Sequence, residues 1–215
     1  MYDFVSGPLV WIAFIGFFGG LLYRLITMAR LAKKDKVVYP TFDAKYGLRS
    51  LLHWVIPFAG VNMRMRPIYT LLSYAFHICV LVTPLFLMGH AVLWQESWGI
   101  RWWSLPEGIA DIMTLVVIFA CIFFIIRRLV RPEVRNVSYP SDFLLALLVM
   151  APFVTGYVAH QQWLPYKPMI IIHGLSGALW LLLIPWTRLV HMLWFPFTRA
   201  YMGSEFGAVR HSRDW

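Results

Sequence analysis

Charged side chains are scarce in this sequence. Asp, Glu, Lys and Arg make up 13% of the 215 residues, whereas hydrophobic residues make up 60%. A soluble domain carries about 25% charged residues, so the composition argues against a soluble enzyme and predicts an integral membrane protein. Acidic residues are the scarcest, with 10 Asp+Glu against 19 Lys+Arg. We attribute the basic excess to membrane topology, not to nucleic-acid binding, because Lys and Arg concentrate in cytoplasmic loops.

Cysteine is nearly absent. Cys79 and Cys121 are the two cysteines, and both lie inside apolar segments. An iron–sulfur cluster needs about four ligands, and covalent haem attachment needs a CxxCH motif. The sequence can supply neither, so any haem is expected to be non-covalent. We interpret both cysteines as small buried apolar side chains.

Five apolar segments are long enough to cross a membrane as helices. We expect these helices at about residues 8–29, 68–94, 108–126, 143–158 and 169–194. Asp3 precedes the first segment and basic residues follow it, which is the reverse of a signal peptide, so we expect it to be retained. The basic clusters share one side if the N-terminus lies outside and the C-terminus is cytoplasmic. The expected fold is all-α, a single multi-pass five-helix bundle in a bacterial or archaeal cytoplasmic membrane.

A long basic connection, residues 31–67, follows the first segment on the predicted cytoplasmic side. Its basic residues are Lys33, Lys34, Lys36, Lys45, Arg49, Arg64 and Arg66. Residues 46–60 mix apolar, aromatic and basic side chains but are too short to span the membrane. We expect an amphipathic segment in the membrane interface. It is either a simple surface anchor or a docking surface for a cytoplasmic subunit.

Four histidines lie inside the apolar segments. His77 and His90 are in the second segment, and His173 and His191 are in the fifth. A polar side chain within a membrane helix is costly and usually faces the bundle interior with a partner. A continuous helix over the fifth segment would place His173 and His191 on one face, about 27 Å apart. Two stacked sites, each binding haem iron through axial imidazole, are the natural interpretation.

The topology predicts how the histidines pair. If the second and fifth helices are antiparallel neighbours, His77 and His191 hold an inner haem, and His90 and His173 hold an outer one. The spacing of His77 and His90 fits less well, because about 3.6 turns leave the two rings on different faces of an ideal helix. Pro84 lies between them and permits a kink. The sequence therefore predicts two b-type haems per chain.

Further residues are candidates to support these sites. Arg64, Arg66 and Arg188 could pair with propionates of the inner haem, or they are ordinary cytoplasmic-side residues that contact lipid. His160 is a reserve ligand near the outer haem. Glycines beside the ligands, such as Gly89, either let a flat macrocycle approach or serve helix packing.

A family resemblance rests on motifs spread over about residues 68–197. The matching motifs are AFHI at 75–78, GH at 89–90, LP at 105–106, RRLVRPEVR at 127–135, PSDFLLALLV at 140–149, IHG at 172–174 and PWTRLVHMLWFP at 185–196. With these motifs the chain resembles the gamma-subunit family of respiratory nitrate reductase, a five-helix di-haem b cytochrome. The resemblance implies that His77, His90, His173 and His191 are the haem ligands, paired as above. It also implies that electrons pass from quinol through two haems to a cytoplasmic iron–sulfur subunit.

Two departures from that family concern spacing and quinone chemistry. His77 and His90 are further apart here, and the family's quinol-pocket lysine is replaced by Ala110, next to Asp111. We therefore name Gly89 and Asp111 as candidate quinone-site residues, with menaquinone as the candidate ligand. The start MYDFVSGPLVW is more similar to the cytochrome b subunits of transmembrane redox complexes of sulfate-reducing bacteria.

Those relatives imply several partners. They sit with a heterodisulfide-reductase-like iron–sulfur protein on the cytoplasmic side, a periplasmic multihaem cytochrome c and other membrane subunits. The resulting hypothesis is an electron-transfer subunit of an oxidoreductase complex. The alternative is a haem-free membrane anchor or small transporter subunit, and the sequence leaves open whether the chain itself is an enzyme.

Overall fold

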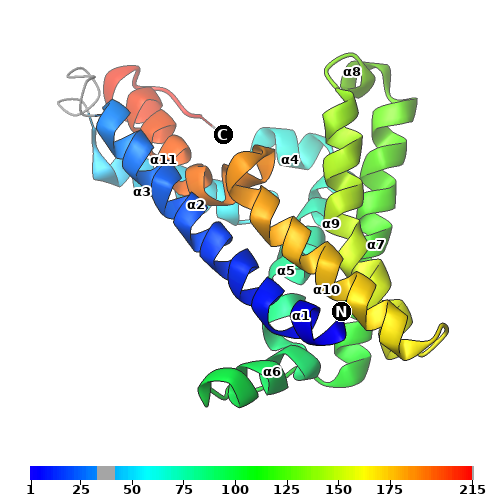
Figure 1. The fold of residues 1–215 in the computed structure, drawn as a ribbon. Coiled ribbons are helices and arrows are strands. Elements are labelled where there is room, and N and C mark those ends of the chain that lie inside the picture. Colours follow the sequence, from blue (N-terminus) through cyan, green and yellow to red (C-terminus); the bar gives the residue numbers. More distant parts are fainter. Residues whose placement is uncertain (33–41, 215) are drawn as a thin grey trace. The chain divides into compact units, whose positions relative to one another are not determined.

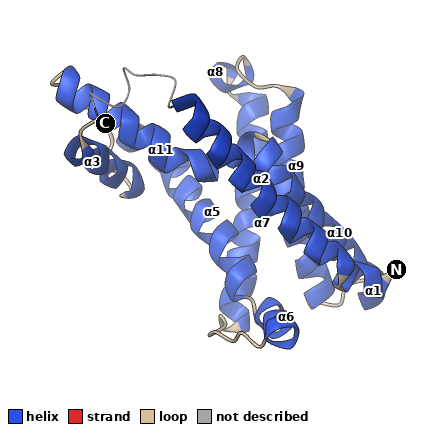
Figure 2. Cartoon of the chain, turned by 60° about the vertical axis from the view of Figure 1, so that its left-hand side comes forward, coloured by secondary structure: helices blue, strands red, loops and turns tan. Residues whose placement is uncertain are grey.

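The computed structural model describes residues 1–32 and 42–214, so Lys33, Lys34 and Lys36 of the basic connection lie outside the described residues. The regular secondary structure in the described ranges is helical (Figure 2). Within them, five helices are long and apolar enough to cross a membrane: Tyr2–Ala32, Pro67–Phe86, Glu107–Val130, Pro140–His160 and Tyr166–Trp186. The prediction of an all-α, multi-pass membrane fold is confirmed. The orientation of the two ends stays a prediction.

The described chain forms two compact units, each built from segments distant in sequence. The first unit comprises Met1–Gly7 and Leu72–Trp180, and the second comprises Pro8–Leu71 and Leu181–Trp215. Two of the three boundaries fall inside long helices, α5 (Pro67–Phe86) and α10 (Tyr166–Leu183), and the third lies between Gly7 and Pro8. His90 and His173 therefore belong to the first unit together, whereas His77 and His191 belong to different units.

The first unit contains α1 (Tyr2–Ser6), most of α5 and α10, α6 (Met88–Trp98), α7 (Glu107–Val130), α8 (Pro132–Arg135) and α9 (Pro140–His160). Helices α7 and α9 pack side by side (Figure 1). The buried face of α7 carries Ala110, Thr114, Val117 and Cys121, which recur at the three- and four-residue spacing of one helical face. Small and β-branched side chains on this face let α9 approach closely.

The second unit contains α2 (Pro8–Ala32), α3 (Ala44–Val55), α4 (Val61–Met65), the short 3₁₀ turns η1 (Ile184–Trp186) and η2 (Arg188–Val190), α11 (His191–Ser204) and η3 (Glu205–Val209). Helices α3 and α11 pack closely. A Cβ on Gly203 would lie 2.2 Å from the Ser50 Cβ, and one on Gly207 would lie 2.2 Å from the Tyr46 ring. The GxxxG spacing of these two glycines lets the backbones approach, as small residues do at membrane helix interfaces.

Helix α3 is the amphipathic segment that the sequence predicts. Asp43 caps its first turn by accepting from the Lys45 and Tyr46 backbone N–H groups. Leu48, Leu52 and Val55 lie on one face and are exposed at 51–59% of their surface. This exposed apolar ridge fits a helix lying in the membrane interface.

Two predicted helices are interrupted. The segment 68–94 divides at Leu87 into α5 and α6, three residues after Pro84. The segment 169–194 leaves α-helical geometry after Leu183, because Pro185 lacks an N–H and disfavours helical geometry in the residue before it. His191 begins a new helix. Counting turns along a continuous helix therefore does not fix the faces of these histidines.

One basic residue near the C-terminus is buried and does not contribute to a basic surface. Arg199 is buried at 8% exposure and forms an ion pair with Asp214, while its Nε donates to the Ser50 hydroxyl. Burial lowers the pKa of Arg199 from its ordinary value, and Asp214 opposes that shift. The residue holds the C-terminal tail against α3 and α11, so it is not available to a partner.

Candidate functional site

The break between α5 and α6 positions His90. Because the helix stops at Phe86, its last carbonyl groups need new donors. The His90 Nδ1 lies 2.7 Å from the Pro84 carbonyl oxygen, and the Trp102 indole N–H donates to the Leu85 carbonyl at 2.9 Å. The Leu105 N–H donates to the Phe86 carbonyl at 2.8 Å. The kink that Pro84 was expected to allow is thus a full break, and His90 helps to cap it.

Residues of helix α9 hold the His173 side chain in place. The His173 Nδ1 lies 3.0 Å from the Pro152 carbonyl oxygen and 3.4 Å from the Thr155 hydroxyl, which also contacts Ser176. Gly156 makes the approach possible, because a Cβ there would lie only 2.9 Å from the His173 Cε1. The ring is therefore fixed by a carbonyl, a hydroxyl and a glycine.

The two rings lie next to each other within the first unit. Their centroids are 5.9 Å apart and their planes differ by 19°. A carbonyl oxygen can only accept, so each Nδ1 carries the proton and each Nε2 keeps its lone pair. Metal-binding histidines commonly donate their other ring N–H to a carbonyl in this way. The structure brings His90 and His173 together, each in a tautomer that leaves the lone pair on Nε2.

The centroid separation of this pair is comparable to that of two imidazoles bound to one metal ion. A metal–imidazole nitrogen bond is about 2.0–2.1 Å, which places the centroids of two rings bound on opposite sides of one ion about 6 Å apart. The described residues hold no group of three or more His, Cys, Asp or Glu side chains that could hold a metal ion. Haem iron bound by two histidines needs no third protein ligand, because the macrocycle supplies the rest.

The glycines near His90 and His173 differ in their surroundings, and helix packing explains only one of them. A Cβ on Gly174 would lie 2.4 Å from Val5, so this glycine serves packing against α1. A Cβ on Gly89 or Gly177 would meet nothing within 4 Å. Gly177 follows His173 by one helical turn on the same face. Gly89 is exposed and neither glycine is crowded by other side chains, so these two positions do not serve close packing.

His77 and His191 are both exposed at the protein surface. The His77 Nδ1 lies 2.7 Å from the Ser73 carbonyl oxygen, and the His191 Nδ1 lies 2.8 Å from the Arg188 carbonyl oxygen. Each therefore shows the same tautomer as the outer pair. Because they belong to separate units, their predicted pairing stays a prediction.

The basic candidates have local roles in the second unit. Arg64 donates to the Phe58 and Ala59 carbonyl oxygens at 3.2 and 3.1 Å. Arg66 ends α4 and is exposed, and Arg188 begins η2 three residues before His191. Their pairing with haem propionates stays a prediction.

A polar cluster joins the ends of α7 and α9. The Gln161 side-chain amide donates to Asp111 at 3.0 Å, and the His160 Nε2 lies 3.6 Å from the other Asp111 oxygen. The structure thus places His160, the reserve ligand, against Asp111. His160 follows Gly156 by one helical turn, so the cluster lies about 6 Å further along α9 than the His173 contact. Sequence reasoning missed Gln161, although its place directly after His160 at a helix end was visible.

Comparison with known proteins finds a relative of similar length. A protein from Nitratidesulfovibrio vulgaris (strain Hildenborough), named only "Protein", is 34% identical over 215 residues, covering 98% of this chain and 95% of the relative. No family model and no solved structure matches the chain.

Proposed function

This chain belongs to the same family as the Nitratidesulfovibrio vulgaris protein, and we propose that it is a di-haem b-type cytochrome subunit of a membrane respiratory redox complex. The observation that carries the proposal is the His90–His173 pair. The nearly parallel rings, with centroids 5.9 Å apart, and the contact of both Nδ1 atoms with carbonyl groups support a role as axial ligands.

Backbone carbonyl groups and a glycine hold the two imidazoles of the proposed outer site. The Pro84 and Pro152 carbonyl groups fix the tautomers and, by hydrogen bonding, make each Nε2 a stronger donor to iron. Gly156 admits the His173 ring to the α9 surface. Haem bound here would supply reversible one-electron transfer. The apolar helices around the pair would exclude water from it.

The inner site is proposed on His77 and His191. In both rings Nδ1 faces a carbonyl oxygen, so the lone pair of the neutral imidazole is on Nε2. Arg64, Arg66 and Arg188 are the proposed partners for propionate groups, because guanidinium binds carboxylate with paired hydrogen bonds. With one site near each membrane surface, the chain would carry electrons across the bilayer.

Two cysteines are too few to hold an iron–sulfur cluster, and we propose that electrons enter and leave the chain through partners. We propose that a cytoplasmic iron–sulfur, heterodisulfide-reductase-like subunit docks on the basic connections, since clustered charge steers and orients a complementary partner. At the outer site we propose exchange with a periplasmic multihaem cytochrome c or with menaquinone. The localisation proposed is a bacterial or archaeal cytoplasmic membrane, alongside other membrane subunits.

The proposed quinone site is based on the cluster of Asp111, His160 and Gln161. Oxidation of a quinol releases protons, and a carboxylate held by His160 and Gln161 at a helix end is a suitable acceptor. Gly89, beside His90, leaves open space where a ring could approach. Quinol oxidation can be tested independently of haem binding, because Asp111→Asn should slow quinol oxidation while leaving haem content unchanged.

The test compares two histidine variants of the purified chain. His173→Ala should lose the absorbance of one b-type haem in a reduced-minus-oxidised spectrum. His53→Ala is the matched control, because the His53 Nδ1 also bonds a carbonyl of its own helix, at 2.9 Å, but lies in α3 of the second unit. Equal spectra for the wild type and both variants would contradict the proposed outer site.

A further inference from the structure

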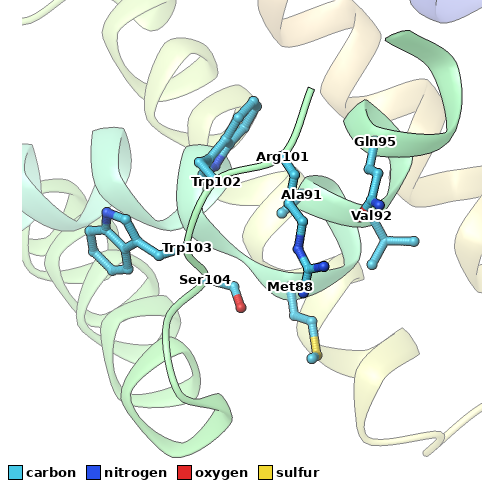
Figure 3. A pocket seen from close by; sticks show the side chains of 8 residues that line it. All are labelled: Met88, Ala91, Val92, Gln95, Arg101, Trp102, Trp103 and Ser104. Carbon is cyan, nitrogen blue, oxygen red and sulfur yellow. The ribbon is translucent and has the colours of Figure 1, made fainter. Parts of the chain in front are cut away.

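A cleft of about 430 Å³ lies between α6 and the loop that follows it (Figure 3). Met88, Ala91, Val92 and Gln95 line its helical wall at the spacing of one helix face, and Arg101, Trp102, Trp103 and Ser104 line its loop wall. His90 falls outside that helical stripe. The cleft therefore uses a different face of α6 from the histidine pair and is a separate site.

Contacts to the end of α5 hold the loop wall in place. The Trp102 indole and the Leu105 N–H both donate to carbonyl groups of that helix end, and the Trp103 ring stacks on Phe86 with centroids 4.5 Å apart. Gly99, in the left-handed conformation at φ 69°, turns the chain back from α6. The cleft is thus pre-formed, and its volume is that of an ordinary small-molecule site.

Arg101 is the one charged residue among those lining the cleft. Across the described part of the chain it has no ion pair, hydrogen bond or ring contact. Figure 3 shows its side chain extending toward Met88, among the apolar residues of α6. A guanidinium directed at an apolar wall, with the Ser104 hydroxyl and the Gln95 amide on the same cleft, calls for an anionic group with an apolar body.

The position of the cleft relative to the membrane indicates the class of ligand. One membrane-spanning helix ends at Phe86 and the next begins at Glu107, so residues 87–106 connect them at one membrane surface. Trp94, Trp98, Trp102 and Trp103 gather there, as tryptophans do at the headgroup level of a bilayer. Phosphate groups of lipids lie at this depth, with acyl chains directly below.

We propose that this cleft binds the phosphodiester headgroup of an anionic membrane lipid. Arg101 pairs with the phosphate oxygens, Gln95 and Ser104 bind the polar headgroup, and Met88 and Val92 contact the upper acyl chain. The proposal does not depend on haem binding. Its failure and that of the proposed function are distinguishable, because the variants below leave all four histidines in place.

The experiment is native mass spectrometry of the full chain in detergent, titrated with phosphatidylglycerol. Arg101→Gln should weaken binding about tenfold, the loss expected for one charge-assisted contact. Arg135→Gln is the matched control, because it removes one exposed arginine outside the cleft and should leave binding unchanged. Val92→Trp should also weaken binding by filling the cleft, and circular dichroism checks that each variant is folded.

Three outcomes would overturn the proposal. Arg101→Gln could bind phosphatidylglycerol as tightly as the wild type. Arg101→Gln and Arg135→Gln could lose binding equally, which would mean a general charge effect. Inorganic phosphate at the same concentration could displace the lipid, which would identify a free-anion site.

Discussion

Substituting Gly156 by alanine should disturb the outer histidine pair directly. The new Cβ would lie 2.9 Å from the His173 Cε1 and 3.0 Å from its Nδ1, about half an ångström inside ordinary contact. The ring can yield only by lengthening its 3.0 Å hydrogen bond to the Pro152 carbonyl. Overpacking of this kind costs about 1–3 kcal/mol, and the gain of about 0.5–1 kcal/mol from replacing a helical glycine offsets only part of that cost.

Gly108→Ala is the matched control for this substitution. Gly108 is also a helical glycine of the first unit, and a Cβ there would meet nothing within 4 Å. Thermal unfolding in detergent should therefore shift down for Gly156→Ala and stay level or shift up for Gly108→Ala. Haem content, measured as the pyridine haemochrome, should fall only for Gly156→Ala. Equal haem content and equal stability in the two variants would refute the role given to Gly156.

Three further predictions test other parts of the account. His77→Ala and His191→Ala should each remove the inner haem and spare the outer one, as seen in redox-titrated spectra, and loss of different haems would disprove their pairing. Gly203→Val should destabilise the packing of α3 on α11 by a few kcal/mol through overpacking, measured as faster proteolysis of these two helices. Asp214→Ala should destabilise the chain by about 3–5 kcal/mol, because Arg199 would stay buried without its partner, and an unchanged unfolding midpoint would show that the pair contributes nothing.

The membrane fold could be predicted from the sequence because long apolar segments and scarce charges allow few other structures. The helix interruptions could not be placed, although Pro84 and Pro185 were visible. A proline in a membrane helix can be absorbed by a kink, or it can end the helix. Which of these occurs depends on donors far along the chain, such as Trp102 and Leu105, that take up the freed carbonyl groups.

The outer histidine pair could be predicted because depth and topology alone bring His90 and His173 together. The contacts that hold these two rings in place could not be predicted from the sequence. The Pro152 carbonyl and Gly156 act through their place on a neighbouring helix, and nothing in their local sequence indicates contact with His173. The burial of Arg199 could not be predicted either, since a basic residue in a basic tail gives no sign that it is buried.

Haem content of the purified chain tests the central claim most directly. A pyridine haemochrome assay, normalised to protein by amino-acid analysis, should give two non-covalent b-type haems per chain. Their reduced-minus-oxidised spectrum should be that of haem with two histidine ligands. A chain that is folded and membrane-inserted but carries no haem would contradict the account and favour a membrane anchor, and a content of one haem would contradict the inner site.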